Sequence, residues 1–126
     1  RKLTLLLLLM VSTNVFAEWT EVGGNDRLTS YVDLGTIKKK KNKVKMWYLY
    51  DYKTVDEVAG KKYLSVMSRN EYDCEEETSQ TLDFYFYSGN MRQGVSVLSS
   101  SIKGETASVT PESIDETFLK IACGKK

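Results

Sequence analysis

The chain of 126 residues lacks histidine altogether and contains one proline and two cysteines. Without histidine, no Cys–His pair can activate a thiol, and no zinc site of mixed Cys and His ligands can form. The sequence also lacks a Gly-x-Ser-x-Gly elbow and a glycine-rich phosphate loop ahead of a helix. These absences predict a protein that is not an enzyme, with no catalytic residue, no cofactor and no metal site.

Acid and base chemistry without histidine would fall to carboxylates, which are densest in the run DCEEE at residues 73–77. Successive residues of a strand point to opposite faces, so such a run rarely converges on one substrate. Clustered carboxylates can hold Ca²⁺ weakly, but the EF-hand spacing is absent. The run therefore predicts a solvated acidic turn.

The first residues have the layout of a secretory signal peptide. Arg1 and Lys2 precede an apolar run from Leu3 to Val11, and the small residues Val15 and Ala17 mark a cleavage site after Ala17. A membrane anchor is the alternative, but the apolar run is well short of the roughly 20 residues that span a bilayer. No cysteine stands at the cleavage point, so the exported chain is expected not to be lipid-anchored.

Cleavage divides the chain into a signal peptide, residues 1–17, and a single domain, residues 18–126, with no linker-like composition inside it. Loss of Arg1 and Lys2 reduces 18 basic residues to 16, against 17 acidic residues that all follow the cleavage point. A near-neutral domain is a poor general nucleic-acid binder. We expect a periplasmic or secreted protein with no membrane span and no nucleic-acid partner.

The two cysteines, Cys74 and Cys123, are best explained as a disulfide. An even pair in an exported protein favours a bridge over a catalytic thiol or a metal ligand. Closing this loop would stabilise the fold by about 4 kcal/mol in the chain-entropy model.

Period-2 patterns between turn signals predict six strands. They cover residues 18–22, 28–33, 44–53, 61–74, 80–88 and 94–100. Connections of hairpin length favour an antiparallel sheet or meander. Within these strands, strict alternation sets Tyr48 and Tyr50 opposite Trp47, Leu64 and Val66 opposite Tyr63, and Leu82, Phe84 and Phe86 opposite Asp83, Tyr85 and Tyr87.

The period changes in the segment TPESIDETFLKIACG, where Ile114, Phe118, Ile121 and Ala122 form one helical stripe. Two starts compete, with Pro111 as a first helical residue or Ser113 and Glu116 as a capping box. Gly124 suits the stop. By helical rotation, Cys123 points away from the middle of this stripe. A disulfide to Cys74 therefore requires either that the last turn of the helix loosens or that Leu119 and Cys123 form a second buried edge of the helix. The fold class is mainly β (α+β), with the C-terminal helix packed on one face of the sheet.

Two surfaces are candidates for partner binding. A single helix covers a six-stranded sheet only partly, so an aromatic face carrying Trp47, Tyr85 and Tyr87 is expected to bind a protein partner or a second copy in a homodimer. The lysine run from Lys38 to Lys45, which includes Lys39, Lys40 and Lys41, is the alternative site, for a polyanionic glycan or lipopolysaccharide. Its simpler interpretation is a solvated hairpin tip, with Asn42 supplying the turn.

The order of several short segments resembles the surface-adhesin protein E family of exported bacterial proteins. The segments are EWTEVG, YVDLGTI, VKMWYLYDYK, YLSVMSRNEYDC and TPESIDE, followed by a final cysteine. The resemblance covers Trp19 to Cys123 and implies a six-stranded antiparallel sheet, a C-terminal helix and a disulfide matching Cys74 and Cys123. It also implies adhesion, since the name-giving member is a dimeric lipoprotein adhesin that binds host matrix proteins. The lipoprotein cysteine of that member is absent here.

Overall fold

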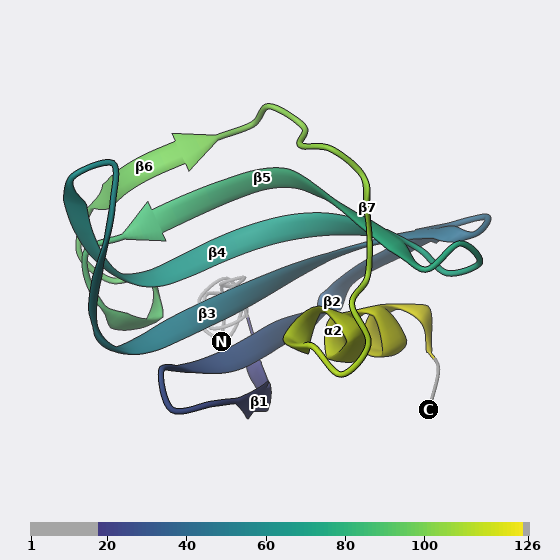
Figure 1. Ribbon diagram of the computed structural model, residues 1–126, viewed down its shortest axis with the longest axis horizontal. Helices are drawn as coiled ribbons and strands as arrows, with labels where there is room; N and C mark the ends of the chain where they lie inside the picture. Colours follow the sequence, from purple (N-terminus) through teal and green to yellow (C-terminus); the bar gives the residue numbers. More distant parts are fainter. Residues whose placement is uncertain (1–17, 125–126) are drawn as a thin grey trace, which may run out of the picture.

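The computed structural model describes residues 18–124, which form one antiparallel sheet with a helix against one face (Figure 1). The strands are β1 (Thr20–Gly24), β2 (Leu28–Lys40), β3 (Lys43–Val58), β4 (Lys61–Asp73), β5 (Thr78–Tyr87) and β6 (Ser96–Ser100), neighbours in that order. A short strand β7 (Ala107–Ser108) pairs with the start of β5, a 3-10 turn spans Asn90–Arg92, and α2 spans Ile114–Cys123. The predicted signal peptide, residues 1–17, lies outside the described residues, as do residues 125–126.

The predicted six-stranded antiparallel meander with one C-terminal helix is confirmed. Two details differ. Strand β7 was not predicted, because a strand of two residues is too short for a periodic pattern. Strands β2 and β3 run further than predicted, to Lys40 and Val58, because β2 ends in lysines and the end of β3 is mostly exposed, so neither end shows the alternation that marks a half-buried strand.

Helix α2 packs over β2, β3 and β4 and closes the main core between itself and the sheet. The fully buried members of this core are Val32, Val44, Met46, Tyr72 and Phe118, joined by Leu119 and Ala122. The predicted helical stripe is confirmed, since Phe118 and Ala122 are buried and Ile114 and Ile121 pack at the core's edge.

The helix begins at the capping box rather than at the proline. The Ser113 Oγ accepts a hydrogen bond from the Glu116 N–H at 3.1 Å, and the Glu116 carboxylate accepts one from the Glu112 N–H at 3.0 Å. Pro111 lies in the turn before the helix. At the other end Gly124 adopts the left-handed conformation, with φ 72°, that ends a helix without a Cβ clash.

The predicted disulfide between Cys74 and Cys123 is present, with the two Cα atoms 5.8 Å apart. It joins the residue after β4 to the last residue of α2. The helix stays regular through Cys123, so its last turn does not loosen. Of the two expected arrangements, the second buried edge is the one observed, because Leu119 is only 3% exposed.

A bulge in β3 overturns one predicted face. Asp51 pairs with Ser65 and Asp56 with Tyr63, so four residues of β3 stand opposite Leu64 alone. Tyr63 lies on the same face as Val66, where its ring contacts Phe86 at 4.7 Å between centroids, so β4 also departs from alternation in this irregular stretch. The prediction placed these two residues on opposite faces because it assumed unbroken alternation, which a bulge resets. Bulges also bend and twist strands, in keeping with the curved sheet of Figure 1.

Candidate binding surfaces

The face of the sheet turned away from α2 carries the predicted aromatic residues together with two arginines. The Trp47 and Tyr85 ring centroids are 6.3 Å apart, and those of Tyr85 and Tyr87 are 6.5 Å apart. The guanidinium of Arg69 lies 5.7 Å above the Trp47 ring, and that of Arg92 lies 5.5 Å above the Tyr87 ring. We call these five residues the Trp47 face. Each arginine is within the range of a cation–π interaction.

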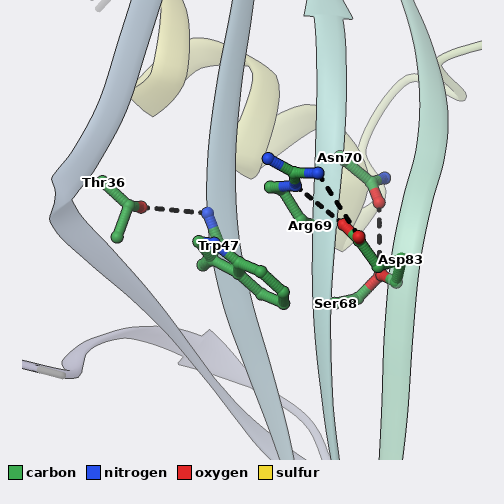
Figure 2. A network of polar contacts seen from close by, with 6 residues as sticks. All are labelled: Thr36, Trp47, Ser68, Arg69, Asn70 and Asp83. Atoms are coloured by element: carbon green, nitrogen blue, oxygen red, sulfur yellow. Dashed lines mark hydrogen bonds and ion pairs between the residues drawn. The ribbon is translucent and has the colours of Figure 1, made fainter. Parts of the chain in front are cut away.

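Arg69 is held in place by an ion pair with Asp83 on the neighbouring strand (Figure 2). Its Nε donates to one carboxylate oxygen at 2.7 Å, and a terminal nitrogen donates to the other at 3.3 Å. The Arg69 side chain is 35% exposed and that of Asp83 only 16%. The fork geometry orients the guanidinium over Trp47 before any partner arrives, which reduces the entropy lost on binding.

A side chain also replaces backbone pairing beside Trp47 (Figure 2). The β2–β3 register is interrupted between Asp33 and Lys38. In this gap the Thr36 Oγ1 accepts the Trp47 N–H at 3.0 Å and donates to the Asp33 carbonyl at 2.6 Å. The backbone of Trp47 is therefore satisfied although β2 bulges away from it.

Arg92 reaches Tyr87 from a tight turn. The hydrogen bonds that hold this turn could not be predicted from the sequence. Met91 and Arg92 have φ values of 50° and 65°, which are unusual for residues other than glycine. The Met91 N–H donates to the Asp51 carboxylate at 2.7 Å, and the Arg92 N–H donates to the buried Ser65 hydroxyl at 2.9 Å. These hydrogen bonds fix the turn against the sheet. Sequence reasoning missed both arginines, although their residue type is frequent at binding hot spots.

The predicted basic site occupies the tip of the β2–β3 hairpin. Lys39 and Lys40 end β2, and Lys41 rather than Asn42 takes the left-handed turn conformation, with φ 58°. The expectation that Asn42 supplies the turn was therefore incomplete. Around the tip lies a hollow of about 620 Å³, lined by lysines between positions 38 and 45 and also by Glu71 and Asp73.

The predicted acidic turn lies directly beside this basic tip, and the two project together in Figure 1. The Cys74 N–H donates to the Asn42 carbonyl at 2.8 Å, and the Asn42 amide donates to the Glu75 carboxylate at 3.4 Å. The pKa of Asp73 is lowered, first by a hydrogen bond from the Glu76 N–H and further by the Glu75 N–H. Nothing in either local sequence indicates that the two turns meet, since the strand register brings them together.

A third surface, which we call the aromatic hollow, lies on the same face as α2 but beyond it. It encloses about 340 Å³ and is lined by residues of β3 to β6, among them Tyr50, Tyr52, Tyr63, Phe84, Phe86 and Leu98. Burial raises the pKa of Tyr63 to about 12 and also raises that of Tyr50. Sequence reasoning missed this site, although the apolar face of β5 extends beyond the reach of a ten-residue helix.

Within residues 18–124 no group of three or more Cys, Asp and Glu side chains is arranged to hold a metal ion. In the same range, no helix has the length and apolar character needed to cross a membrane.

A curved antiparallel meander whose C-terminal helix is bonded by a disulfide to the end of β4 defines a class of small α+β domain. The chain belongs to the surface-adhesin protein E family, whose model matches residues 19–124. This finding confirms the resemblance predicted from the sequence. A search of curated proteins finds no match.

Solved structures of Haemophilus influenzae protein E share the fold. Its crystal form II has a TM-score of 0.68 at 18% identity, with 90% of this chain and 92% of that chain covered. The selenomethionine form gives 0.66 at 18% identity, covering 90% and 91%. Protein E from the non-typeable organism gives 0.58 at 19% identity, covering 90% and 80%. At such low identity the likeness establishes the fold.

Proposed function

We propose that this chain is a non-catalytic protein-binding module of the bacterial cell envelope and that the Trp47 face is its contact surface. The observation that carries the proposal is the arrangement of Arg69, held by Asp83 and stacked on Trp47, beside Tyr85 and Tyr87. Tryptophan, tyrosine and arginine are the residue types that dominate binding hot spots. The family of surface adhesins to which the chain belongs supports an exported, adhesin-like role.

We also propose that the chain is exported, that its signal peptide is cleaved after Ala17, and that the mature protein is periplasmic or secreted without a lipid anchor. The signal-peptide layout and the lack of a cysteine at the cleavage point support this location. Intact-mass measurement of the protein from the cell envelope is expected to give a chain that begins at Glu18 with no added lipid mass. A chain that retains residues 1–17, or one that carries acyl groups, would contradict it.

The binding surface can be tested with single substitutions. Tyr87→Ala and Trp47→Phe are compared with Val55→Ala, a truncation at a residue that is 53% exposed and lies outside the Trp47 face. A partner captured from envelope or host-surface extracts is expected to bind the Tyr87→Ala variant about 30-fold more weakly, the loss for a hot spot of about 2 kcal/mol. Equal binding by all three folded variants would refute the assignment.

We also propose that the partner at the Trp47 face can be a second copy of this chain, which would form a homodimer. Light scattering of the wild-type chain over a range of concentrations would show a dimer that Tyr87→Ala weakens. If the protein stays monomeric, the partner is a different chain.

The basic hairpin tip supports a second candidate, a polyanionic glycan or lipopolysaccharide. The lysine-lined hollow favours it, but Glu71 and Asp73 line the same hollow and reduce its positive potential. Retention on heparin resin is expected to fall steeply with NaCl if lysines displace counterions from the ligand. Lys40→Ala and Lys41→Ala are expected to lower the slope, and retention independent of salt would exclude this candidate.

A further inference from the structure

The aromatic hollow is bordered on one side by β6, the last strand of the sheet path. Strand β6 pairs with β5 along one edge, and no described strand pairs with its other edge. An unpaired edge presents a row of backbone N–H and C=O groups that can accept another strand. The hollow and a free strand edge are therefore adjacent.

The two outer edges of the sheet differ in their protection. Both outer strands have a register shift, β1 between Glu21 and Gly23 and β6 at Val97, but β1 also carries Glu21, a charge that discourages strand addition. The segment from Gly94 to Ile102, which contains β6, has no charged residue and no proline. It also exposes Val95 and Ile102, at 66% and 83%. The β6 edge is the one open to pairing.

The hollow itself is uncharged. Every lining residue is neutral, and the rings form a chain of edge-to-face contacts in which Tyr52 meets Tyr63 at 5.3 Å, Tyr63 meets Phe86 at 4.7 Å and Phe86 meets Phe84 at 5.5 Å. Such contacts fix ring orientations. Arg27, which lies 6.0 Å from the Tyr52 ring at the border of the hollow, is already paired with Asp56 at 3.0 Å. A charged group entering the hollow would therefore lose hydration without gaining a free ionic partner, so the chemistry selects an apolar group.

The register of β6 connects these two features. Leu98 pairs with Phe86, and both line the hollow, whereas Ser99 pairs with Tyr85 on the opposite face. A strand added to β6 would lie about 4.8 Å away and would direct alternate side chains to the Leu98 side. Aromatic and long side chains of the added strand could then contact residues diagonally opposite them on β6.

We propose that the β6 edge and the aromatic hollow together bind an extended segment of a partner protein with ring-bearing apolar side chains at alternate positions. Backbone hydrogen bonds to β6 hold the segment, and the hollow selects its side chains. This site lies on the sheet face opposite the Trp47 face, so it is a second binding surface.

The test uses the ¹⁵N-labelled mature chain, residues 18–126, and three probes. The first probe is a capped peptide Ser-Thr-Phe-Thr-Phe-Thr-Ser, the second is the same peptide with both Phe replaced by Ser, and the third is benzyl alcohol. The Phe peptide is expected to slow amide exchange in Ser96–Ser100 and to shift the ring signals of Tyr63 and Phe86. The Ser peptide is expected to do neither, and the ¹⁵N-resolved indole N–H signal of Trp47 is expected to stay unchanged with every probe.

Two neighbouring substitutions provide the matched control. Leu98→Asp adds a charge on the hollow side, and Ser99→Asp adds the same charge on the opposite side of the same strand. Leu98→Asp is expected to weaken binding of the Phe peptide at least about tenfold, and Ser99→Asp is expected to weaken it less than about twofold. If Leu98→Asp does not fold, Leu98→Ala replaces it in the test. Leu98→Ala adds no charge, is expected to leave the fold intact, and should also weaken binding of the Phe peptide.

Four results would overturn the proposal. They are equal effects of Leu98→Asp and Ser99→Asp, binding of benzyl alcohol without binding of the peptide, protection of β6 by self-association in the absence of peptide, and peptide shifts confined to the Trp47 face. Tyr87→Ala is expected to leave peptide binding unchanged. Failure of this proposal is thereby distinguished from failure of the Trp47 face as a binding surface.

Discussion

Replacing both cysteines by serine tests how the disulfide stabilises the fold. The bridge joins residues 49 positions apart and ties the last residue of α2 to the end of β4. In the chain-entropy model, opening a loop of this length costs about 4 kcal/mol. A domain of this size is typically stable by about 5–15 kcal/mol, so the change would remove a large part of that free energy. The double replacement avoids leaving a free thiol.

The measurement is urea unfolding followed by circular dichroism, with the wild-type chain kept oxidised. With a slope of roughly 1–3 kcal/mol per molar urea, a loss of about 4 kcal/mol lowers the midpoint by roughly 1.3–4 M. Ser99→Ala serves as the control, because Ser99 is exposed and its replacement is expected to change stability by less than about 0.5 kcal/mol.

A loss below about 1 kcal/mol would refute the reasoning, since it would mean that the loop is already closed in the unfolded chain or that the bridge strains the native one. The spectral signal adds a second test. Phe118, Leu119 and Ala122 remain to hold α2 on the sheet without the bridge, so helix and sheet are expected to unfold in one transition. Helical signal lost well before the sheet signal would show that these contacts do not hold the helix alone.

Three further substitutions test the helix. Phe118→Ala, at a fully buried side chain, is expected to cost about 3–5 kcal/mol in urea unfolding. Ser113→Ala removes the N-cap acceptor and is expected to cost about 1 kcal/mol, whereas Thr117→Ala on the exposed side should cost less than about 0.5 kcal/mol. Burial raises the pKa of Asp115, so the stability contributed by its neutral form is present below the unfolded pKa and is lost as pH rises through the folded pKa. Asp115→Asn should therefore be more stable than wild type at pH 7, and a difference that stays constant down to pH 3 would contradict this reasoning.

The elements that were predicted correctly are those in which local pattern and burial agree. Strand β4 alternates around Val66 and Tyr72, and α2 has a cap, an apolar stripe and a glycine stop within 15 residues. The disulfide followed from the number of cysteines and the expected compartment. Each of these signals is local or compositional, so no knowledge of tertiary contacts was needed.

The errors share a different origin. The prediction assigns Tyr63 to the wrong face because β4 departs from alternation where the β3–β4 register is interrupted, and no residue type on either strand marks that interruption. The aromatic hollow was missed because its existence depends on where α2 stops along the sheet. Helix length could be predicted, but its position over β2 to β4 is fixed by packing between residues distant in sequence.

The lysine tip illustrates how register decides the meaning of a charged run. Across the β2–β3 pair, Lys38 stands opposite Lys45 and Lys40 opposite Lys43, which places like charges together. Such pairs destabilise a sheet, and opposite charges in the same relation stabilise it by about 0.2–1 kcal/mol. Strand β4 supplies the opposite charges, because Asp73 stands opposite Lys43 and Glu71 opposite Lys45.

The carboxylates of β4 therefore relieve repulsion that the basic run creates within its own hairpin. Part of the lysine charge is balanced inside the molecule before any ligand arrives, and the adjacent acidic turn balances more of it. Lysines with carboxylates opposite them in the sheet are expected to displace fewer counterions from a polyanion than the same lysines in an isolated peptide would. For this reason the run that is most conspicuous in the sequence is a weaker candidate for function than the Trp47 face, where the ion pair with Asp83 holds Arg69 over an aromatic ring beside two tyrosines.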